Sequence, residues 1–280
     1  MKKKFLILML LALSGIGSAL QAQVQYINHH TYDLYPDGHA VITDSPCDIH
    51  YKLVNLPETV NYDNTTYNIT ELGTKAFYGC STLQWISLRS NLSSIGDSAF
   101  YGCENLRVVI KTSDLTSIGA YAFCNCTKLQ PIDFSVPFYE LSIGNGAFKG
   151  CTALDRITIR SDCPTFPDEV FCNCTNLSEI VLPDNLVEIG NNAFYGCTSL
   201  ASISLPVTLI TVKPGAFEGC TSLTEFTVLT GNAVFAASEG VLIKHGTELV
   251  AYPAGKTDTS YNIPSYITSI ASKAFAGCSQ

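Results

Sequence analysis

Cysteine is the residue type with the most chemistry to offer in this chain, because 12 of its 280 residues are Cys. Cys124-x-Cys126 and Cys172-x-Cys174 have the spacing of metal-ligand pairs. A zinc site needs four convergent Cys or His ligands. The repeat described below places the two pairs in separate coils, so we predict no metal site and no cofactor.

Disulfide bonds are the second chemistry that cysteine offers. Eight Cys occupy one position of the repeat: Cys80, Cys103, Cys126, Cys151, Cys174, Cys197, Cys220 and Cys278. Stacked neighbours have parallel Cβ vectors, and disulfide geometry is narrow, so we predict that these eight are unpaired, small buried side chains. Cys124 and Cys172 lie two coils apart, roughly 10 Å at the strand spacing, which is too far for a bridge. Cys47 and Cys163 are off the pattern, and the sequence assigns them no partner.

Catalytic motifs are missing from the sequence. It contains no Gly-x-Ser-x-Gly elbow, no His-Glu-x-x-His and no phosphate-binding loop. Asp155, Glu179 and Glu225 share one predicted face, but they form a row rather than a hydrogen-bonded acid/base pair. We therefore expect no enzymatic activity. The net charge of −8 argues against a nucleic-acid partner and against docking on anionic lipid.

An internal repeat organises most of the chain. The phrase Ala-Phe-x-Gly-Cys-x-x-Leu recurs about every 23 residues, with its Phe at Phe77, Phe100, Phe123, Phe148, Phe171, Phe194, Phe217 and Phe275. A unit this short cannot bury its own apolar side, so successive units must stack as the coils of a solenoid. The segment Leu-x-x-Ile-x-Leu has the period of a strand, which predicts a parallel sheet along one face. The Ala-Phe turn with its following Gly predicts a short helical turn on the other face.

The repeat resembles a known family. The pattern Ile-Gly-x-x-Ala-Phe-x-Gly-Cys-x-x-Leu-x-x-Ile-x-Leu-Pro is similar to the BspA-like class of leucine-rich repeats, over about residues 56–280. This class is found on bacterial and some protozoan surfaces. The resemblance implies a leucine-rich-repeat solenoid whose role is surface display and the binding of host or bacterial proteins.

The segments outside the regular repeat complete the predicted organisation. Residues 1–22 carry Lys2 to Lys4 before a short apolar run and read as a secretory signal, which predicts a secreted or cell-surface protein. No later stretch is long and apolar enough to be a membrane helix, so we expect no integral membrane segment after cleavage. We assign 23–70 to a β-rich N-terminal cap, 71–228 to the repeats, and 229–280 to a hairpin insertion and a last, incomplete repeat.

The outward positions of the predicted strands are the candidate binding surface. We select Trp85, Val108, Ile110, Arg156 and Glu179, because exposed Trp and Arg are frequent anchors of protein interfaces. The alternative is that the N-terminal cap covers Trp85, which lies in the first full coil.

Three functions follow from these patterns. The first is an adhesin-like module that binds a host matrix protein or a bacterial surface protein. The second is a structural spacer within a longer surface protein. The third is carbohydrate binding, for which we expect a row of exposed aromatic residues.

Overall fold

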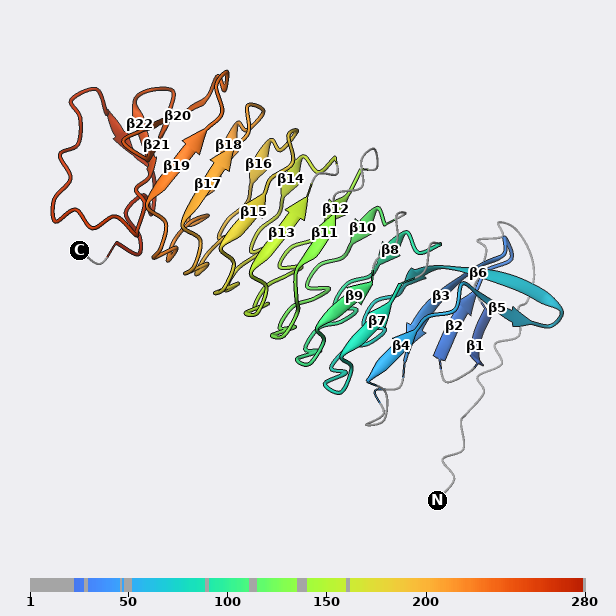
Figure 1. The fold of residues 1–280 in the computed structure, drawn as a ribbon. Helices are drawn as coiled ribbons and strands as arrows, with labels where there is room; N and C mark the ends of the chain where they lie inside the picture. Colours follow the sequence, from blue (N-terminus) through green and yellow to red (C-terminus); the bar gives the residue numbers. More distant parts are fainter. Residues whose placement is uncertain are drawn as a thin grey trace.

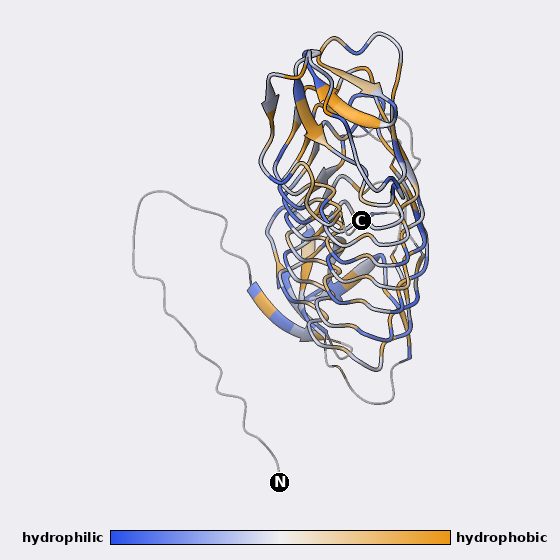
Figure 2. Cartoon of the chain, turned by 90° about the vertical axis from the view of Figure 1, so that its left-hand side faces the viewer, coloured by the Kyte–Doolittle hydropathy of each residue, from blue (hydrophilic) through white to orange (hydrophobic). Residues whose placement is uncertain are grey.

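The structure is a computed structural model that describes residues 23–27, 30–45, 47, 52–88, 91–110, 115–134, 140–159 and 162–278. The chain winds into coils that stack on one another along a single long axis (Figure 1). Viewed from the side, the coils superpose into one tube (Figure 2). The predicted solenoid is therefore confirmed.

The Leu-x-x-Ile-x-Leu segments form the strands of one face, as predicted. These strands are β7 (Trp85–Ser87), β9 (Val108–Ile110), β11 (Ile132–Phe134), β13 (Arg156–Ile159), β15 (Glu179–Val181), β17 (Ser202–Leu205) and β19 (Glu225–Val228). An eighth strand, β4 (Leu53–Asn55), pairs with β7 from upstream. The pairing is parallel and runs in three stretches, β4-β7-β9, β11-β13-β15 and β17-β19. We call the outer surface of these strands the strand face.

A second parallel ladder was not predicted. It is formed by the Ile-Gly segments: β8 (Ser94–Ile95), β10 (Ser117–Ile118), β12 (Ser142–Ile143), β14 (Thr165–Phe166), β16 (Glu188–Ile189) and β18 (Thr211–Val212). Each strand is two residues long and pairs in parallel with a strand of an adjacent coil, as Ile118 does with Ile95 and Ile143; the ladder is broken between β12 and β14. Each coil is thus hydrogen-bonded to its neighbours on two sides.

The predicted helical turn is wrong, because none of the described residues forms a helix. The Ala-Phe segments are turns that contain two residues of positive φ, for example Lys75 (φ 62°) and Gly79 (φ 70°) in the first one. A helix needs a φ near −63° throughout. The second of these positions is the glycine that the sequence highlighted, whereas the first is also occupied by Ser98 and Tyr121.

Stacked phenylalanine rings fill the interior. From Phe77 to Phe217, the centroids of neighbouring ladder rings lie 5.1–5.6 Å apart and their planes are nearly parallel. The backbone N–H groups of these residues also join the coils, since Phe100 donates to the Ala122 carbonyl at 2.7 Å. One residue per coil therefore contributes both ring packing and a hydrogen bond to the stack.

The ladder cysteines are buried hydrogen-bond donors. The Sγ of Cys126 lies 3.1 Å from the carbonyl oxygen of Phe100 in the preceding coil, and Cys174 makes the same contact with Phe148 at 3.1 Å. Burial raises the pKa of the Cys103 and Cys220 thiols to about 12. The thiols therefore keep the proton that they donate.

The first ladder cysteine corrects the prediction that all eight are unpaired. Cys80 forms a disulfide with Cys47, with their Cα atoms 4.8 Å apart. Its partner, Cys47, had no assigned partner in the sequence analysis. Cys47 precedes β4, and β4 was not recognised in the sequence analysis as a strand of the stack. The other seven ladder cysteines are free, as are Cys124, Cys163 and Cys172.

The N-terminal strands extend the second ladder. They are β1 (Gln23–Ile27), β2 (His30–Leu34), β3 (His39–Asp44), β5 (Thr59–Tyr62) and β6 (Thr65–Leu72). The sheet order is β1-β2-β3-β6-β8, so it continues directly into the coils. Tyr32, Leu34 and Ile42 are buried against the first coils as part of the main hydrophobic core.

The C-terminal segment contains the predicted hairpin. Strands β21 (Val241–Lys244) and β22 (Glu248–Ala251) pair antiparallel on either side of His245 and Gly246. Strand β20 (Phe235–Ser238) pairs with β21, and β23 (Ser269–Ile270) pairs parallel with β22. The chain thus returns to a coil geometry at β23.

Candidate binding face

Alternation along each strand determines which side chains reach the strand face. The central apolar residue points inward, so that Ile86, Ile157 and Ile203 are buried. The residue before it points outward because successive side chains alternate between the two faces of a strand. Parallel pairing then places the outward residues of neighbouring coils side by side, separated by about 4.8 Å.

Trp85 lies at the N-terminal end of this face and is exposed. Its side chain is 37% exposed, and β4 of the N-terminal segment covers one side of it without burying it completely. Leu53 is opposite Trp85 in the register of β4 and β7, and it is 54% exposed. The two residues form an apolar pair that the interior does not require.

Val108 and Ile110 lie in the next strand. Val108 is opposite Trp85 in the register of β7 and β9, and Ile110 is opposite Ser87. Their side chains lie outside the described part of the structure, so their orientation stays a prediction. Pro131 occupies the corresponding outward position one coil later and is exposed.

Arg156 and Glu179 lie in the middle of the face and are both exposed. They are direct partners in the register of β13 and β15. Opposite charges on adjacent strands are a favourable cross-strand pair. Arg156 is three coils from Trp85, roughly 14 Å at the strand spacing. The selected residues therefore follow one another along a single surface, with the apolar pair at one end.

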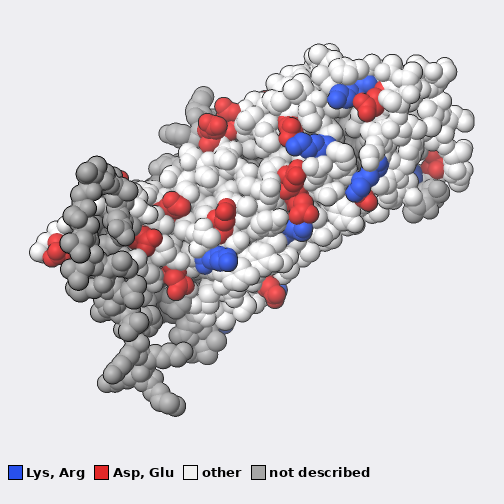
Figure 3. All heavy atoms as spheres, turned by 180° about the vertical axis from the view of Figure 1, so that it is seen from behind, with Lys and Arg blue, Asp and Glu red and all other residues white. Residues whose placement is uncertain are grey.

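The far end of the face is polar. Ser202 and Glu225 are opposite each other in β17 and β19, and both are exposed. The face therefore changes from apolar to charged to hydroxyl-rich and acidic along the solenoid. From behind, the molecule shows Lys and Arg side chains interspersed with Asp and Glu, amid a wide uncharged surface (Figure 3).

Leu53 is the member of this face that the sequence analysis missed. The available signal was Leu56-Pro57 at the end of β4, which corresponds to Leu205-Pro206 at the end of β17. Aligning these two phrases places Leu53 at the position of Ser202, and thus one strand upstream of Trp85. The coil was overlooked because its Ala-Phe turn is missing.

Chemical function elsewhere in the structure is sparse. Among the described residues, no three His, Cys, Asp or Glu side chains converge as they would around a metal ion. In the same part of the chain, no helix has the length and apolar character needed to cross a membrane.

The Asp37 and His39 side chains stabilise a turn. A carboxylate oxygen of Asp37 lies 2.5 Å from His39 Nδ1 and accepts the His39 backbone N–H at 3.2 Å. The backbone hydrogen bond from His39 lowers the pKa of this exposed carboxyl group. The His39 ring stacks on Tyr35 with centroids 4.1 Å apart, so the pair closes the connection between β2 and β3.

Comparison with known families gives a match over most of the chain. A family model described as the BspA type leucine rich repeat region matches residues 57–142, 141–238 and 254–280, in six copies. No curated protein sequence matches the chain.

Solved structures give the same answer for the fold. A leucine rich cell surface protein from Faecalibacterium prausnitzii is 26% identical with a TM-score of 0.83, and the match covers 93% of this chain and 69% of that one. A leucine rich repeat protein from T. pallidum is 30% identical with a TM-score of 0.51, over 73% of this chain and 82% of that one. The pneumococcal vaccine antigen PcpA shares the fold, at 21% identity and a TM-score of 0.61, over 92% of this chain and 62% of its own.

Proposed function

Because this chain belongs to the BspA-type leucine-rich repeat family, we propose that it is a secreted or cell-surface module that binds another protein in the manner of an adhesin. It performs no catalysis. The strand face supplies the contact through Trp85, Val108, Ile110, Arg156 and Glu179, with Leu53 extending the apolar end.

The exposed apolar pair of Leu53 and Trp85 carries this proposal. A large apolar side chain left in solvent adds nothing to the core, which the Phe, Leu, Ile and Cys ladders already fill. Trp surrounded by a polar rim is the usual composition of an interface hot spot. The charged pair of Arg156 and Glu179 then supplies orientation at the polar end.

Two observations support a location outside the cell. Disulfides such as Cys47–Cys80 form and persist mostly in oxidising compartments, such as the exterior of a bacterial cell. The Faecalibacterium prausnitzii protein of similar structure is described as a cell surface protein. The predicted leader, residues 1–22, lies outside the described residues and stays a prediction.

Replacing Trp85 tests the binding role directly. We expect Trp85→Ala to lose at least tenfold in affinity for its protein partner, because truncating a hot-spot side chain removes about 2 kcal/mol or more of binding free energy. The melting temperature should change by less than about 2 °C, since the side chain lies outside the core. Binding of the mature chain to immobilised extracellular-matrix proteins and to bacterial surfaces is the readout.

Tyr195→Ala is the matched control, because Tyr195 is 38% exposed but lies in a turn rather than on the strand face. Saturable capture that Trp85→Ala abolishes and Tyr195→Ala preserves supports the proposal. Equal capture by all three proteins would refute the assignment of the face. If no surface captures the wild-type chain, the structural spacer becomes the better reading.

A further inference from the structure

The hydrogen-bonded stack is interrupted after the coil that contains Phe217. In the six preceding coils the N–H of the ladder Phe donates to the next coil, from Phe77 onto Ala99 at 2.7 Å to Phe194 onto Ala216 at 2.8 Å. The same bond reappears from Tyr252 to the Ala274 carbonyl at 2.7 Å. The N–H of Phe217 has no backbone acceptor among the described residues.

Gly215 shows the same interruption two residues upstream. The equivalent N–H of Asn192 donates to the Pro214 carbonyl at 3.3 Å, whereas that of Gly215 has no acceptor in the described part of the chain. Both Gly215 and Phe217 are buried. A buried N–H without a partner costs about 1–3 kcal/mol, and native proteins rarely leave one. An acceptor therefore belongs beside these two groups.

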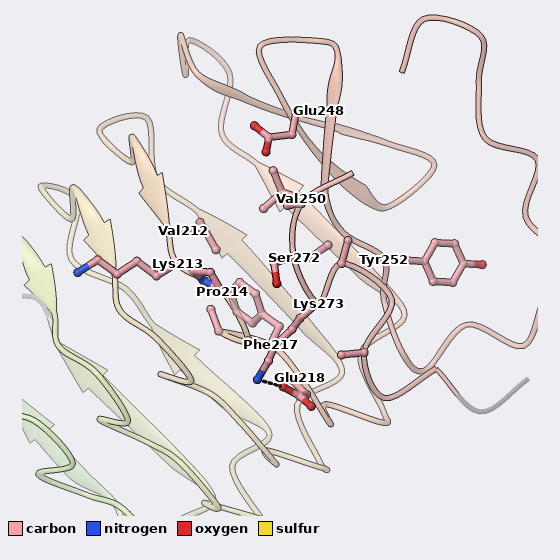
Figure 4. Close-up of a pocket in the computed structure, with 16 residues that line it drawn as sticks. Val212, Lys213, Pro214, Phe217, Glu218, Glu248, Val250, Tyr252, Ser272 and Lys273 are labelled. Carbon is pink, nitrogen blue, oxygen red and sulfur yellow. Dashed lines mark hydrogen bonds and ion pairs between the residues drawn. The ribbon is translucent and has the colours of Figure 1, made fainter. Parts of the chain in front are cut away.

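A cavity of about 270 Å³ lies where that acceptor would be. Residues 212–218 form one wall, and residues of β22 and of the last turn form the other (Figure 4). The Tyr252 ring points away from the cavity and stacks on Phe275, with centroids 5.2 Å apart. At this position the coil of Tyr252 pairs with the last coil and not with the coil of Phe217, although Gly255 still donates to the Leu223 carbonyl at 2.8 Å.

The charges around the cavity are mostly neutralised. The Nζ of Lys273 lies 2.8 Å from Glu218 across the opening, and Lys213 pairs with Glu188 at 2.7 Å. The lining includes six small residues, Ala216, Ala251, Ala271, Ser272, Ala274 and Ala276, beside the larger Val212, Pro214, Phe217 and Val250. The cavity therefore offers a slot with Glu248 and the two ion-paired lysines in its lining and with two N–H donors on one wall.

We propose that this slot binds a peptide segment of a partner protein, with small side chains, whose backbone carbonyls accept hydrogen bonds from the N–H groups of Gly215 and Phe217. Two donors separated by two residues require two carbonyls with the same separation, which a turn of the repeat provides. Pro214 and Ala216 already supply such carbonyls to Asn192 and Phe194 in the coil before. The alanine lining admits small side chains and excludes large ones. The site uses none of the outward residues of the strand face, so it is independent of the function proposed above.

Amide hydrogen exchange measured by NMR tests the free edge first. In the free protein we expect the amides of Gly215 and Phe217 to exchange at least about tenfold faster than those of Asn192 and Phe194, which occupy the same positions one coil earlier. Equal protection of the two pairs would mean that the edge is closed in solution, and it would overturn the proposal.

Peptide addition tests the occupant. The capped peptide acetyl-Ser-Ala-Ser-Ala-Ser-Ala-amide should slow exchange at Gly215 and Phe217 at least about tenfold at saturation, because each N–H gains an acceptor. The Ser-Leu counterpart of the same length should not. If the Ser-Ala peptide leaves both amides unchanged, the slot holds only water and the proposal fails.

A variant whose larger side chain fills the cavity provides a second test of the site. Ser272→Phe places a ring at the cavity wall and should abolish the effect of the peptide, while Ser81→Phe, at an exposed serine of a distant turn, should preserve it. Should Ser272→Phe not fold, the comparison of Ser-Ala with Ser-Leu peptides on the wild-type chain still decides. Retention of the full peptide effect in folded Ser272→Phe would place the contact elsewhere and refute the site.

Discussion

At the scale of single residues, the ladder cysteines explain why a thiol is repeated where alanine would also fit. The Sγ atoms from Cys103 to Cys220 on the ladder each donate to a Phe carbonyl of the coil before, as Cys197 does to Phe171 at 3.2 Å. That carbonyl also accepts the backbone N–H of Cys174 in its own coil, at 3.1 Å. The thiol thus adds a cross-coil contact within the buried interior. This role requires the protonated form.

Alkaline pH should therefore destabilise the fold through these thiols. The pKa of Cys103 and of Cys220 is raised to about 12 by burial, above the ordinary value near 8.5–9 that an unfolded thiol has. The unfolded chain then loses protons first, so the free energy of unfolding is constant below about pH 8.5 and falls as the pH rises toward 12. At pH 10 each such thiol lowers the free energy of unfolding by about 1–2 kcal/mol.

Urea unfolding of the wild type and of Cys220→Ala at pH 7, 8.5 and 10 measures this effect. The wild type should lose more stability between pH 8.5 and 10 than Cys220→Ala does, because the variant has one titrating thiol fewer. Keeping the pH at or below 10 limits the contribution of Tyr32, whose pKa burial raises to about 12. An identical pH dependence of the two proteins would contradict the role assigned to the thiol.

At the scale of elements, the Ile-Gly phrase is explained by the close approach of consecutive coils. A Cβ on Gly190 would lie 2.6 Å from the carbonyl carbon of Pro167 and 2.7 Å from the nitrogen of Asp168, both in the preceding coil. Backbone atoms cannot move aside as a flexible side chain can. The glycine is thus required by packing rather than by a positive φ.

Gly190→Ala should consequently destabilise the protein by about 3 kcal/mol, at the upper end for overpacked sites. Gly246→Ala is the control, because Gly246 has a φ of 70° with no atom within 4 Å of the added Cβ. Its cost is the left-handed conformation alone, about 1 kcal/mol. Thermal or urea unfolding of both variants gives the comparison, and an equal or reversed order would show that the coils are not packed this closely.

The elements also show what the sequence could and could not predict. The strands and the Phe and Cys columns were predictable, because a fixed spacing brings identical residues into register. The conformation of the turns was not, since Lys75, Ser98 and Tyr121 have a positive φ without being glycine. The partner of Cys80 was also hidden, because Cys47 precedes a coil that lacks the Ala-Phe phrase. On the candidate face, the exposure of Trp85 followed from strand alternation, whereas Leu53 required recognition of that same coil.

At the scale of the whole molecule, stability depends on neighbours rather than on a central core. The ring column is continuous from Phe77 to Phe217 and resumes only between Tyr252 and Phe275. Beyond it, both residues of β23 are exposed, with Ile270 50% exposed. The sequence predicted an insertion within 229–280, but it did not predict which hydrogen bonds are missing, because Ala251-Tyr252 resembles the Ala-Phe phrase.

The central claim is that consecutive coils are joined in register by these backbone hydrogen bonds, and NMR scalar couplings across hydrogen bonds test it most directly. Couplings should link the amide nitrogens of Phe100, Phe123 and Phe194 to the carbonyl carbons of Ala122, Ala147 and Ala216, respectively. Tyr252 should couple to Ala274, and Phe217 should show no such coupling in the free protein. Couplings from these amides to carbonyls four residues earlier in their own segments, as in a helix, would contradict the account.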